Sequence, residues 1–380
     1  MRYTDPYYTG GDYSRYGHAT SQFPQFDDPS RAAYAYPTQA PPRYSEIVGR
    51  APTVERPWYD VRGWSLRKKL IVAGCVVVII VAVIVGAVEG TKAAAYPNYS
   101  ALNYTLKDTY SGSSFFDNFE YATSDPTNGF VQYVDSQTAS QMNLTYASES
   151  SAVIKVDTDT QNQTSGRKSV RITSTNTYES GLFIFDVVHT PYGCATWPAL
   201  WLTDPSNWPE NGEIDVIESN NNGTNGNSMT LHTSSGCKMN VRRKETGSAQ
   251  VKKATYGGAF NDNGGGVYAM ELRDAGIRIW MFTRDNVPSD ISNSSSTPDP
   301  STWGEALADF PSTNCDISSH FRNQSIVANI DICGDLAGAD SYYKDMYSCP
   351  GSCKQYAAEN GAAFGDAYWE FNSFKVYSAS

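Results

Sequence analysis

Three carboxylates stand within one six-residue segment, Glu213-Ile-Asp-Val-Ile-Glu218. Side chains of a regular strand alternate between its two faces, so Glu213 and Asp215 would share a face and Glu218 would point away. A single β-bulge near residues 216 and 217 shifts this alternation by one and returns Glu218 to the face of the other acids. We therefore predict a bulged strand with three acids on one side and apolar residues toward a core.

Carboxylates arranged in this way suit glycoside hydrolysis. Two carboxyl groups about 5–5.5 Å apart support a double displacement that retains configuration, with one acid as nucleophile and the other as proton donor. A third acid between them can share a proton with a neighbour, and like charges this close raise at least one pKa. The alternatives are a calcium site and an exposed acidic edge. Calcium usually takes acids from an irregular loop, whereas Ile214, Val216 and Ile217 indicate a half-buried strand.

The composition is typical of a secreted, β-rich protein. The chain has 380 residues, a formal charge of −11 and 18% charged residues, with 26 Tyr and 8 Trp. This acidity disfavours nucleic acid and anionic membrane surfaces as partners, and it is compatible with a neutral polymer such as glucan.

An uninterrupted apolar stretch of 19 residues runs from Leu70 to Val88. A helix of that length spans about 28 Å at ~1.5 Å per residue, close to the ~30 Å core of a lipid bilayer. Arg67, Lys68 and Lys69 precede it, which places the N-terminus in the cytosol and the rest in a lumen or outside the cell, at the plasma membrane or cell wall. We predict one transmembrane signal anchor over residues 67–90. The rivals are a cleavable signal peptide, for which the preceding 69 residues are too long, and a buried helix, for which a polar face is missing.

The segments around this stretch are predicted from their composition. Residues 1–66 lack apolar periodicity and are rich in Tyr, Pro, Ser and Asp, so we predict a disordered cytosolic tail. Within it, Pro41-Pro-Arg-Tyr44 matches the Pro-Pro-X-Tyr ligands of WW domains, against the alternative of chance in a Pro- and Tyr-rich tail. We predict a flexible stalk over residues 91–113 and a folded outer domain over residues 114–380.

Two kinds of residue support an oxidising, glycosylating compartment for that domain. Seven Asn-X-Ser/Thr sequons all follow the apolar stretch, at Asn98, Asn103, Asn143, Asn162, Asn222, Asn293 and Asn323. Six of the seven cysteines also follow it, which predicts disulfides without fixing their pairing: Cys194, Cys237, Cys315, Cys333, Cys349 and Cys353. The alternative is a zinc site at Cys349 and Cys353, which no second Cys or His pair accompanies.

Short alternating or apolar runs, separated by turn residues, fill the chain from about Phe115. Examples are residues 181–188, 228–233 and 367–377. The runs 267–272 and 277–282 flank Arg273-Asp-Ala-Gly276, which is a hairpin signal. About 265 residues of this kind predict one all-β sandwich domain.

Longer motifs around the acids carry a resemblance to a known family. They are Pro191-Tyr-Gly-Cys-Ala-Thr-Trp-Pro-Ala-Leu-Trp201, Asn207-Trp-Pro-Glu-Asn-Gly-Glu-Ile-Asp-Val-Ile-Glu-Ser219, and Met229-Thr-Leu-His-Thr233 with Gly236-Cys237. With them, residues 113–378 resemble glycoside hydrolase family 16, in its fungal laminarinase-like, endo-1,3(4)-β-glucanase branch. The chain departs from the family pattern at Asn211, where Gly is common, and at Ser228, where Gln is frequent.

The resemblance implies a β-jelly-roll sandwich with a concave substrate cleft that cuts β-1,3- or mixed-linkage β-1,3/1,4-glucan internally. It implies Glu213 as nucleophile, Glu218 as general acid/base and Asp215 as their electrostatic helper. No cofactor or catalytic metal is implied, and a structural calcium stays open.

Trp201 and Trp208 match family positions that contact sugars near the cleavage point. Aromatic faces pack against the C–H faces of pyranose rings at low entropic cost. His232 matches a polar residue beside the acid/base, with a purely structural histidine as the alternative. Trp197 is expected to pack in the core.

Three functions fit these residues. The first is an endo-β-1,3(4)-glucanase at or near a fungal cell wall. The second is a transglycosylase that passes the same glycosyl intermediate to a sugar instead of water. The third is a membrane-held glucan-binding protein without activity, which the retention of all three acids disfavours.

Overall fold

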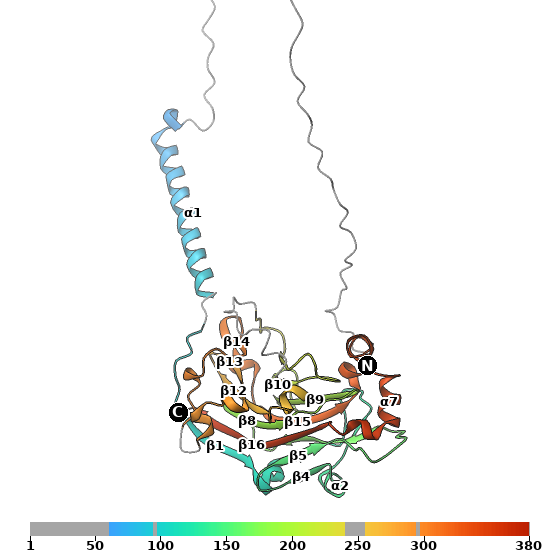
Figure 1. The fold of residues 1–380 in the computed structure, drawn as a ribbon. Helices are drawn as coiled ribbons and strands as arrows, with labels where there is room; N and C mark the ends of the chain where they lie inside the picture. The colour runs from blue at the N-terminus through green and yellow to red at the C-terminus, as the bar shows by residue number, and fades with distance from the viewer. Residues whose placement is uncertain (1–60, 94–96, 240–254, 294–296, 380) are drawn as a thin grey trace, which may run out of the picture. The chain divides into compact units, whose positions relative to one another are not determined.

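Two antiparallel β-sheets packed face to face form the body of the folded domain (Figure 1). The structure is a computed structural model and describes residues 61–93, 97–239, 255–293 and 297–379. The larger sheet has eight strands, in the order β14 (Ala308–Pro311), β13 (Gly276–Thr283), β12 (Gly266–Arg273), β8 (Gly181–His189), β16 (Tyr368–Ala379), β5 (Ala152–Lys155) and β4 (Thr145–Ala147), with β1 (Tyr104–Ser111) also paired to β16.

The smaller sheet carries the acidic segment. Its six strands run in the order β11 (Ser228–His232), β10 (Glu213–Glu218), β9 (Thr196–Thr203), β15 (Ser325–Ile332), β7 (Arg171–Ser174) and β2 (Phe119–Tyr121). A parallel pair is formed by β3 (Val131–Tyr133) and β6 (Arg167–Ser169). Among the described residues neither sheet closes on itself, so the fold is a jelly-roll-like sandwich. The prediction of an all-β sandwich domain is confirmed.

The helices of the domain are short and lie in connections. The α-helices are α2 (Ser136–Gln141), α3 (Gly258–Asn261), α4 (Ser289–Ser292), α5 (Ile317–His320), α6 (Gly334–Ala337) and α7 (Cys353–Glu359). The 3-10 helices are η2 (Gly112–Asn118), η4 (Arg284–Asn286), η5 (Pro300–Thr302), η6 (Ser312–Asn314) and η8 (Gly361–Phe364), and η7 (Ser341–Met346) is a short π-helix.

Helix α1 (Leu66–Ala93) follows a 3-10 turn, η1 (Val61–Gly63). Its apolar side chains from Leu70 to Val83 are largely exposed. In the part of the chain that the structure describes, no helix is both long enough and apolar enough to cross a membrane. The predicted anchor over Leu70–Val88 remains a prediction of the sequence. The Pro41–Tyr44 motif and the predicted tail up to residue 60 lie outside the described residues.

The core lies between the two sheets. Leu200 and Leu202 of β9, with Ile214 of β10, are fully buried on the inner face of the smaller sheet. Phe371 and Phe374 of β16 belong to the same cluster from the larger sheet, with ring centroids 4.7 Å apart. Because strand side chains alternate, this apolar inner face directs the intervening polar residues of β9 and β10 to the outer face.

Strand β1 corrects the predicted start of the domain. It pairs antiparallel with β16 from Tyr104↔Ala379 to Ser111↔Ser373, with one irregularity. The predicted stalk over residues 91–113 is therefore wrong from residue 104 onward. The strand has contact with the core mainly through Tyr104 and Tyr110, so its sequence carries little apolar signal.

The predicted hairpin is confirmed. Strands β12 and β13 pair without interruption from Gly266↔Thr283 to Arg273↔Gly276, and Asp274-Ala275 form the two-residue connection. The runs predicted around residues 181–188, 228–233 and 367–377 are strands β8, β11 and β16.

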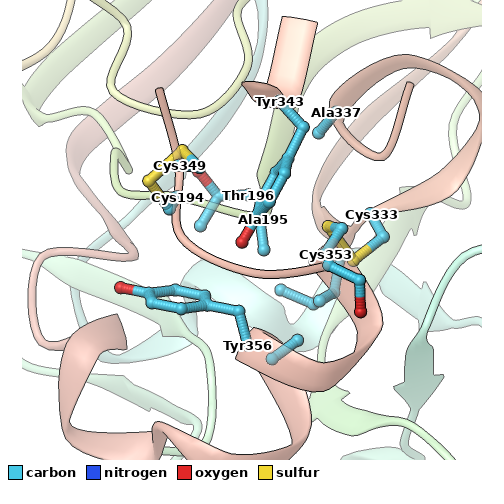
Figure 2. Close-up of a disulfide and its surroundings, with 12 residues drawn as sticks. Cys194, Ala195, Thr196, Cys333, Ala337, Tyr343, Cys349, Cys353 and Tyr356 are labelled. Carbon is cyan, nitrogen blue, oxygen red and sulfur yellow. A yellow bond between two sulfur atoms is a disulfide. The ribbon is translucent and has the colours of Figure 1, made fainter. Parts of the chain in front are cut away.

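Three disulfides pair all six cysteines that follow the apolar stretch: Cys194–Cys349, Cys237–Cys315 and Cys333–Cys353. The predicted disulfides are confirmed. The zinc alternative is wrong, because Cys349 and Cys353 bond to different partners. Figure 2 shows the first and third bridges on either side of Ala195 and Thr196. Cys194–Cys349 ties the segment after β15 to the residue pair that precedes β9, whereas Cys333–Cys353 closes a loop within that segment. A disulfide commonly contributes about 2–4 kcal/mol to stability.

Candidate active site

Strand β10 contains the predicted bulge. Against β9, Asp215 pairs with Trp201, but Ile217 pairs with Leu200 and Glu218 with Ala199, so Val216 is an additional residue. Ala199 and Trp201 are two positions apart on β9 and share a face, which places Glu218 on the same face as Asp215. Val216 and Ile217 are both fully buried. The bulge is therefore confirmed, and it brings all three acids to the outer face of the smaller sheet.

Each outer acid accepts a hydrogen bond from a tryptophan. The indole Nε1 of Trp208 donates to Glu213 Oε2 at 2.8 Å, and that of Trp197 donates to Glu218 Oε1 at 2.9 Å. Trp208 comes from the loop between β9 and β10, and Trp197 from β9 itself. Two rigid side chains thus fix the direction of the two carboxylates that a double displacement requires.

The central acid, Asp215, is buried and poorly compensated. It is 3% exposed, and its Oδ2 atom has no hydrogen-bond donor among the described residues. His232 Nε2 lies 3.4 Å from that atom and 3.8 Å from Glu213 Oε1, as an ion pair at the end of β11. The site therefore gathers three acids around one imidazole.

Burial and proximity shift the pKa values in this cluster. Burial raises the pKa of Asp215 to about 7, and the neighbouring Glu218 and Glu213 carboxylates add to the rise. Burial likewise raises the pKa of Glu213, against the effects of His232 and the Trp208 hydrogen bond. Close polar contact with Asp215 raises the pKa of His232 to about 9. Glu213, Asp215 and His232 therefore hold their protons more strongly than they would in water.

The predicted sugar-contacting tryptophans take different positions. Trp201 lies on β9 beside Asp215, donates from Nε1 to Asn329 Oδ1 at 2.8 Å and has the Arg171 guanidinium 4.9 Å from its ring centre. Trp208 is 57% exposed. Both lie within the neighbourhood of Glu213 and Asp215, and their role in binding remains a prediction, as does that of His232.

Trp197 is a functional candidate that the sequence interpretation missed. It was expected in the core, but it is only partly buried and bonds to Glu218. The signal in the sequence was strand alternation: Trp197 lies four residues before Trp201 and two before Ala199, so all three share one face of β9. Asn329 was also missed, although it occupies a polar position in the alternating run of β15.

A cation could also fit the cluster. One ligand atom each from Glu213, Asp215 and His232 lies within 4.8 Å of the others. The prediction that the site works without a metal therefore stays a prediction.

Comparison with known proteins identifies the class. Residues 118–255 and 242–377 match the family model described as the XgeA-like, catalytic domain of glycoside hydrolase family 16. The chain therefore belongs to glycoside hydrolase family 16, as its motifs indicated, and it is a glycoside hydrolase of the endo-1,3(4)-β-glucanase-like type.

Several relatives show how far the similarity extends. A Schizosaccharomyces pombe protein named as a probable glycosidase is 42% identical over 304 residues, which are 74% of this chain and 71% of that protein. The Emericella nidulans endo-1,3(4)-β-glucanase xgeA is 36% identical over 73% of this chain and 48% of its own length. The chain thus spans about half the length of some curated relatives.

Two solved structures share the fold at high identity. Laminarinase 16A from Phanerochaete chrysosporium, with β-glucans in its donor and acceptor sites, is 41% identical with a TM-score of 0.69. It matches 73% of this chain and 100% of its own. An elongating family 16 β-1,3-glucosyltransferase is 36% identical with a TM-score of 0.66, covering 72% of this chain and 100% of that one.

Proposed function

We propose that this protein is a retaining endo-β-glucanase that hydrolyses β-1,3- or mixed-linkage β-1,3/1,4-glucan. The observation that carries the proposal is the bulge at Val216, because it sets Glu213 and Glu218 on one face of one strand. The glucan-bound laminarinase and the relatives named endo-1,3(4)-β-glucanase support the substrate class.

The first half-reaction forms a covalent intermediate. The Glu213 carboxylate attacks the anomeric carbon while the bond from that carbon to the glycosidic oxygen breaks. Glu218 gives its proton to the departing oxygen, so the leaving chain gains a hydroxyl and Glu213 becomes a glycosyl ester. The indole hydrogen bonds from Trp208 and Trp197 orient the two groups for attack and proton transfer.

The second half-reaction releases the product with retained configuration. Glu218, now a carboxylate, takes a proton from a water molecule that attacks the anomeric carbon, and the ester bond to Glu213 breaks. Negative charge returns to Glu213 at that moment. Asp215 and His232, in contact with Glu213 or adjacent to it, stabilise that change by sharing protons within the cluster.

The outer face of the smaller sheet is the proposed floor of the concave substrate cleft. Trp201 and Trp208 lie near the acids, and we propose that their faces orient sugar rings there. His232 is proposed to act as a polar contact for the same sugar region.

The test uses purified protein with laminarin, lichenan and barley mixed-linkage glucan. We expect shorter oligosaccharides from at least one of them, with the β-anomer formed first by NMR. Absence of cleavage in all three would overturn the hydrolase proposal. Initial formation of the α-anomer would overturn the retaining mechanism.

A transglycosylase is the second candidate, and the elongating glucosyltransferase at 36% identity favours keeping it. The same intermediate would then be resolved by a sugar hydroxyl in place of water. Products longer than the substrate at high oligosaccharide concentration would identify transfer.

We also propose that Leu70–Val88 anchors the domain in a lipid bilayer with its N-terminus in the cytosol. The uninterrupted apolar sequence supports this, as does the exposure of the described apolar side chains of α1. Six of the seven sequon asparagines are exposed, and Asn222 is partly buried. Release of the full chain by carbonate extraction would contradict anchoring. An unchanged electrophoretic mobility after treatment with an N-glycosidase would contradict the outer location.

A WW-domain protein remains the proposed partner of Pro41–Tyr44. Unchanged turnover and localisation of a Tyr44→Ala variant would overturn it.

A further inference from the structure

The bulge in β10 breaks the regular ladder toward β11. Asp215 pairs with Thr230, and the next paired residue is Glu218 opposite Ser228. Two residues of β10 therefore face one residue of β11, and an additional residue in a bulge leaves backbone groups without their ladder partners. The backbone N–H and C=O groups affected lie next to Glu218. Whether they find other hydrogen-bond partners therefore determines how rigidly that acid is held.

One side chain satisfies both sides of the bulge. Asn227 directly precedes β11, and its Oδ1 accepts a hydrogen bond from the Glu218 backbone N–H at 2.9 Å. Its Nδ2 donates to the Val216 backbone carbonyl at 2.9 Å. A carboxamide is suited to this position, because it offers an acceptor and a donor on one planar group.

Asn227 is itself held by the core. Its backbone N–H donates to Thr255 Oγ1 at 3.1 Å, and the Thr255 carbonyl accepts from the hydroxyl of Tyr268. Tyr268 is fully buried on β12 of the larger sheet. The preceding residue is also fixed, since Ser219 Oγ donates to the Gly226 carbonyl at 3.3 Å. The chain of contacts thus runs from the larger sheet to the backbone of Glu218.

We propose that Asn227 is a positioning residue that fixes the bulge and so directs Glu218 at the glycosidic oxygen. This rests on the proposed function, in which Glu218 is the acid/base. Loss of the carboxamide leaves the Glu218 N–H and the Val216 carbonyl without these partners and lets the strand relax. The Trp197 hydrogen bond then holds only the end of the Glu218 side chain.

The experiment compares Asn227→Ala with wild type on two substrates. With laminarin, whose sugar leaving group needs a proton, we expect kcat to fall about 10- to 100-fold, the size typical of a catalytic group misplaced by about 1 Å. We expect KM to change by less than about threefold, because Asn227 makes its contacts inside the protein. With a dinitrophenyl β-laminaribioside, the glycosylation step needs no proton from Glu218, so we expect its rate constant, measured from the pre-steady-state burst of dinitrophenol, to fall by less than about threefold.

The matched control is Asn225→Ala, on the same loop and exposed, which we expect to leave both rates unchanged. Equal losses on both substrates would indicate a general structural defect and overturn the proposal, as would wild-type rates of Asn227→Ala.

If Asn227→Ala does not fold, as judged by its thermal transition, Asn227→Asp replaces it. That variant keeps the acceptor for Glu218 but loses the donor to Val216, and the same difference between substrates is expected. A wild-type protein that cleaves neither substrate would refute the proposed function instead.

Discussion

Two carboxylates, Asp215 on β10 and Glu271 on β12, are almost equally buried, but their neighbours are very different. Glu271 is 1% exposed. Its Oε1 accepts from the Tyr104 hydroxyl at 2.7 Å, and its Oε2 accepts from Arg278 Nε at 2.9 Å and Nη2 at 2.6 Å. Arg273 Nη1 adds a contact at 3.3 Å. Two cations and a phenol therefore compensate this one charge.

Asp215 is 3% exposed and has two acidic neighbours in place of two cations. Within the described part of the chain, its cationic partner is His232, and that residue is shared with Glu213. Burial without full compensation favours the protonated acid and costs stability when the group ionises. The pKa of about 7 follows from this arrangement.

The difference separates a structural carboxylate from a chemical one. Around Glu271, hydrogen bonds join β1, β12 and β13, so the charge serves the larger sheet. Around Asp215, the charge is only partly compensated. This is typical of a site that exchanges protons and negative charge, because a carboxylate with a full set of cationic partners would not change its protonation near neutral pH. Substitutions at the two sites should therefore separate activity from stability.

The largest effect is expected for Glu213→Gln. Removal of the proposed nucleophile should reduce kcat on laminarin by at least about 10³-fold, since an amide cannot form the glycosyl ester. The thermal transition should be unchanged or slightly higher, because burial disfavours the Glu213 charge. The measurements are reducing-sugar release and a melting curve.

Glu210→Gln provides the control, three residues earlier and exposed, and it should retain full activity. Full activity of Glu213→Gln would remove Glu213 from the mechanism.

The sequence was sufficient for the acid strand and insufficient for its surroundings. The bulge followed from the 2.0-residue period of a strand and the spacing of three acids, which are local properties. The partners of Glu271 are not local, because Tyr104 lies 167 residues away in a strand with little apolar signal. A comparably large separation made the disulfide pairing unpredictable, because Cys194 bonds to a cysteine 155 residues later.

Trp197 shows a second limit of local interpretation. A tryptophan between Thr196 and Pro198 in an apolar run reads as core, yet alternation in β9 turns it outward to Glu218. The period of the strand could have placed it there only if the strand's start had been known. Local sequence therefore predicted which acids share a strand face, but it did not predict that Trp197 bonds to one of them.

The second effect is expected in stability. Glu271→Gln leaves Arg278 and Arg273 without their charged partner in a buried position, and breaking such a pair typically costs about 3–5 kcal/mol. Denaturant unfolding at pH 7 should show this loss, while kcat at a temperature below the transition stays near wild type. The exposed Glu149→Gln is the control. A loss of activity in folded Glu271→Gln would contradict the separation of the two sites.

The third effect is the pH dependence of stability at Asp215. Because its folded pKa of about 7 is raised above the ordinary value, its contribution to stability is present below about pH 4 and is lost as pH rises through 7. The raised pKa of His232 acts in the same direction, with loss as pH rises through about 9. Asp215→Asn removes the ionisation, so its stability relative to wild type should increase from pH 4 to pH 8, by about 4 kcal/mol at most.

Thermal or urea unfolding at the two pH values measures that difference. Asp285→Asn, at an exposed position, should show no such trend. A constant difference between Asp215→Asn and wild type would mean that Asp215 titrates as it does in water.

The smallest effect is expected for Trp208→Phe, which keeps an aromatic face and removes the indole N–H. The Trp208 hydrogen bond lowers the pKa of Glu213 and so opposes burial. Without it, Glu213 should remain protonated to a higher pH, and a protonated carboxyl cannot attack. The acid limb of kcat/KM should therefore move to higher pH, with a loss of several-fold at pH 5. The loss is expected to stay below the full ~1.5–3 kcal/mol of a hydrogen bond to a charged group, because Trp208 is 57% exposed and water can replace part of that bond. Trp303→Phe, which loses an indole bond to Asp290 instead, should leave the limb in place. A limb that moves to lower pH in Trp208→Phe would show that the indole opposes the Glu213 charge rather than supports it.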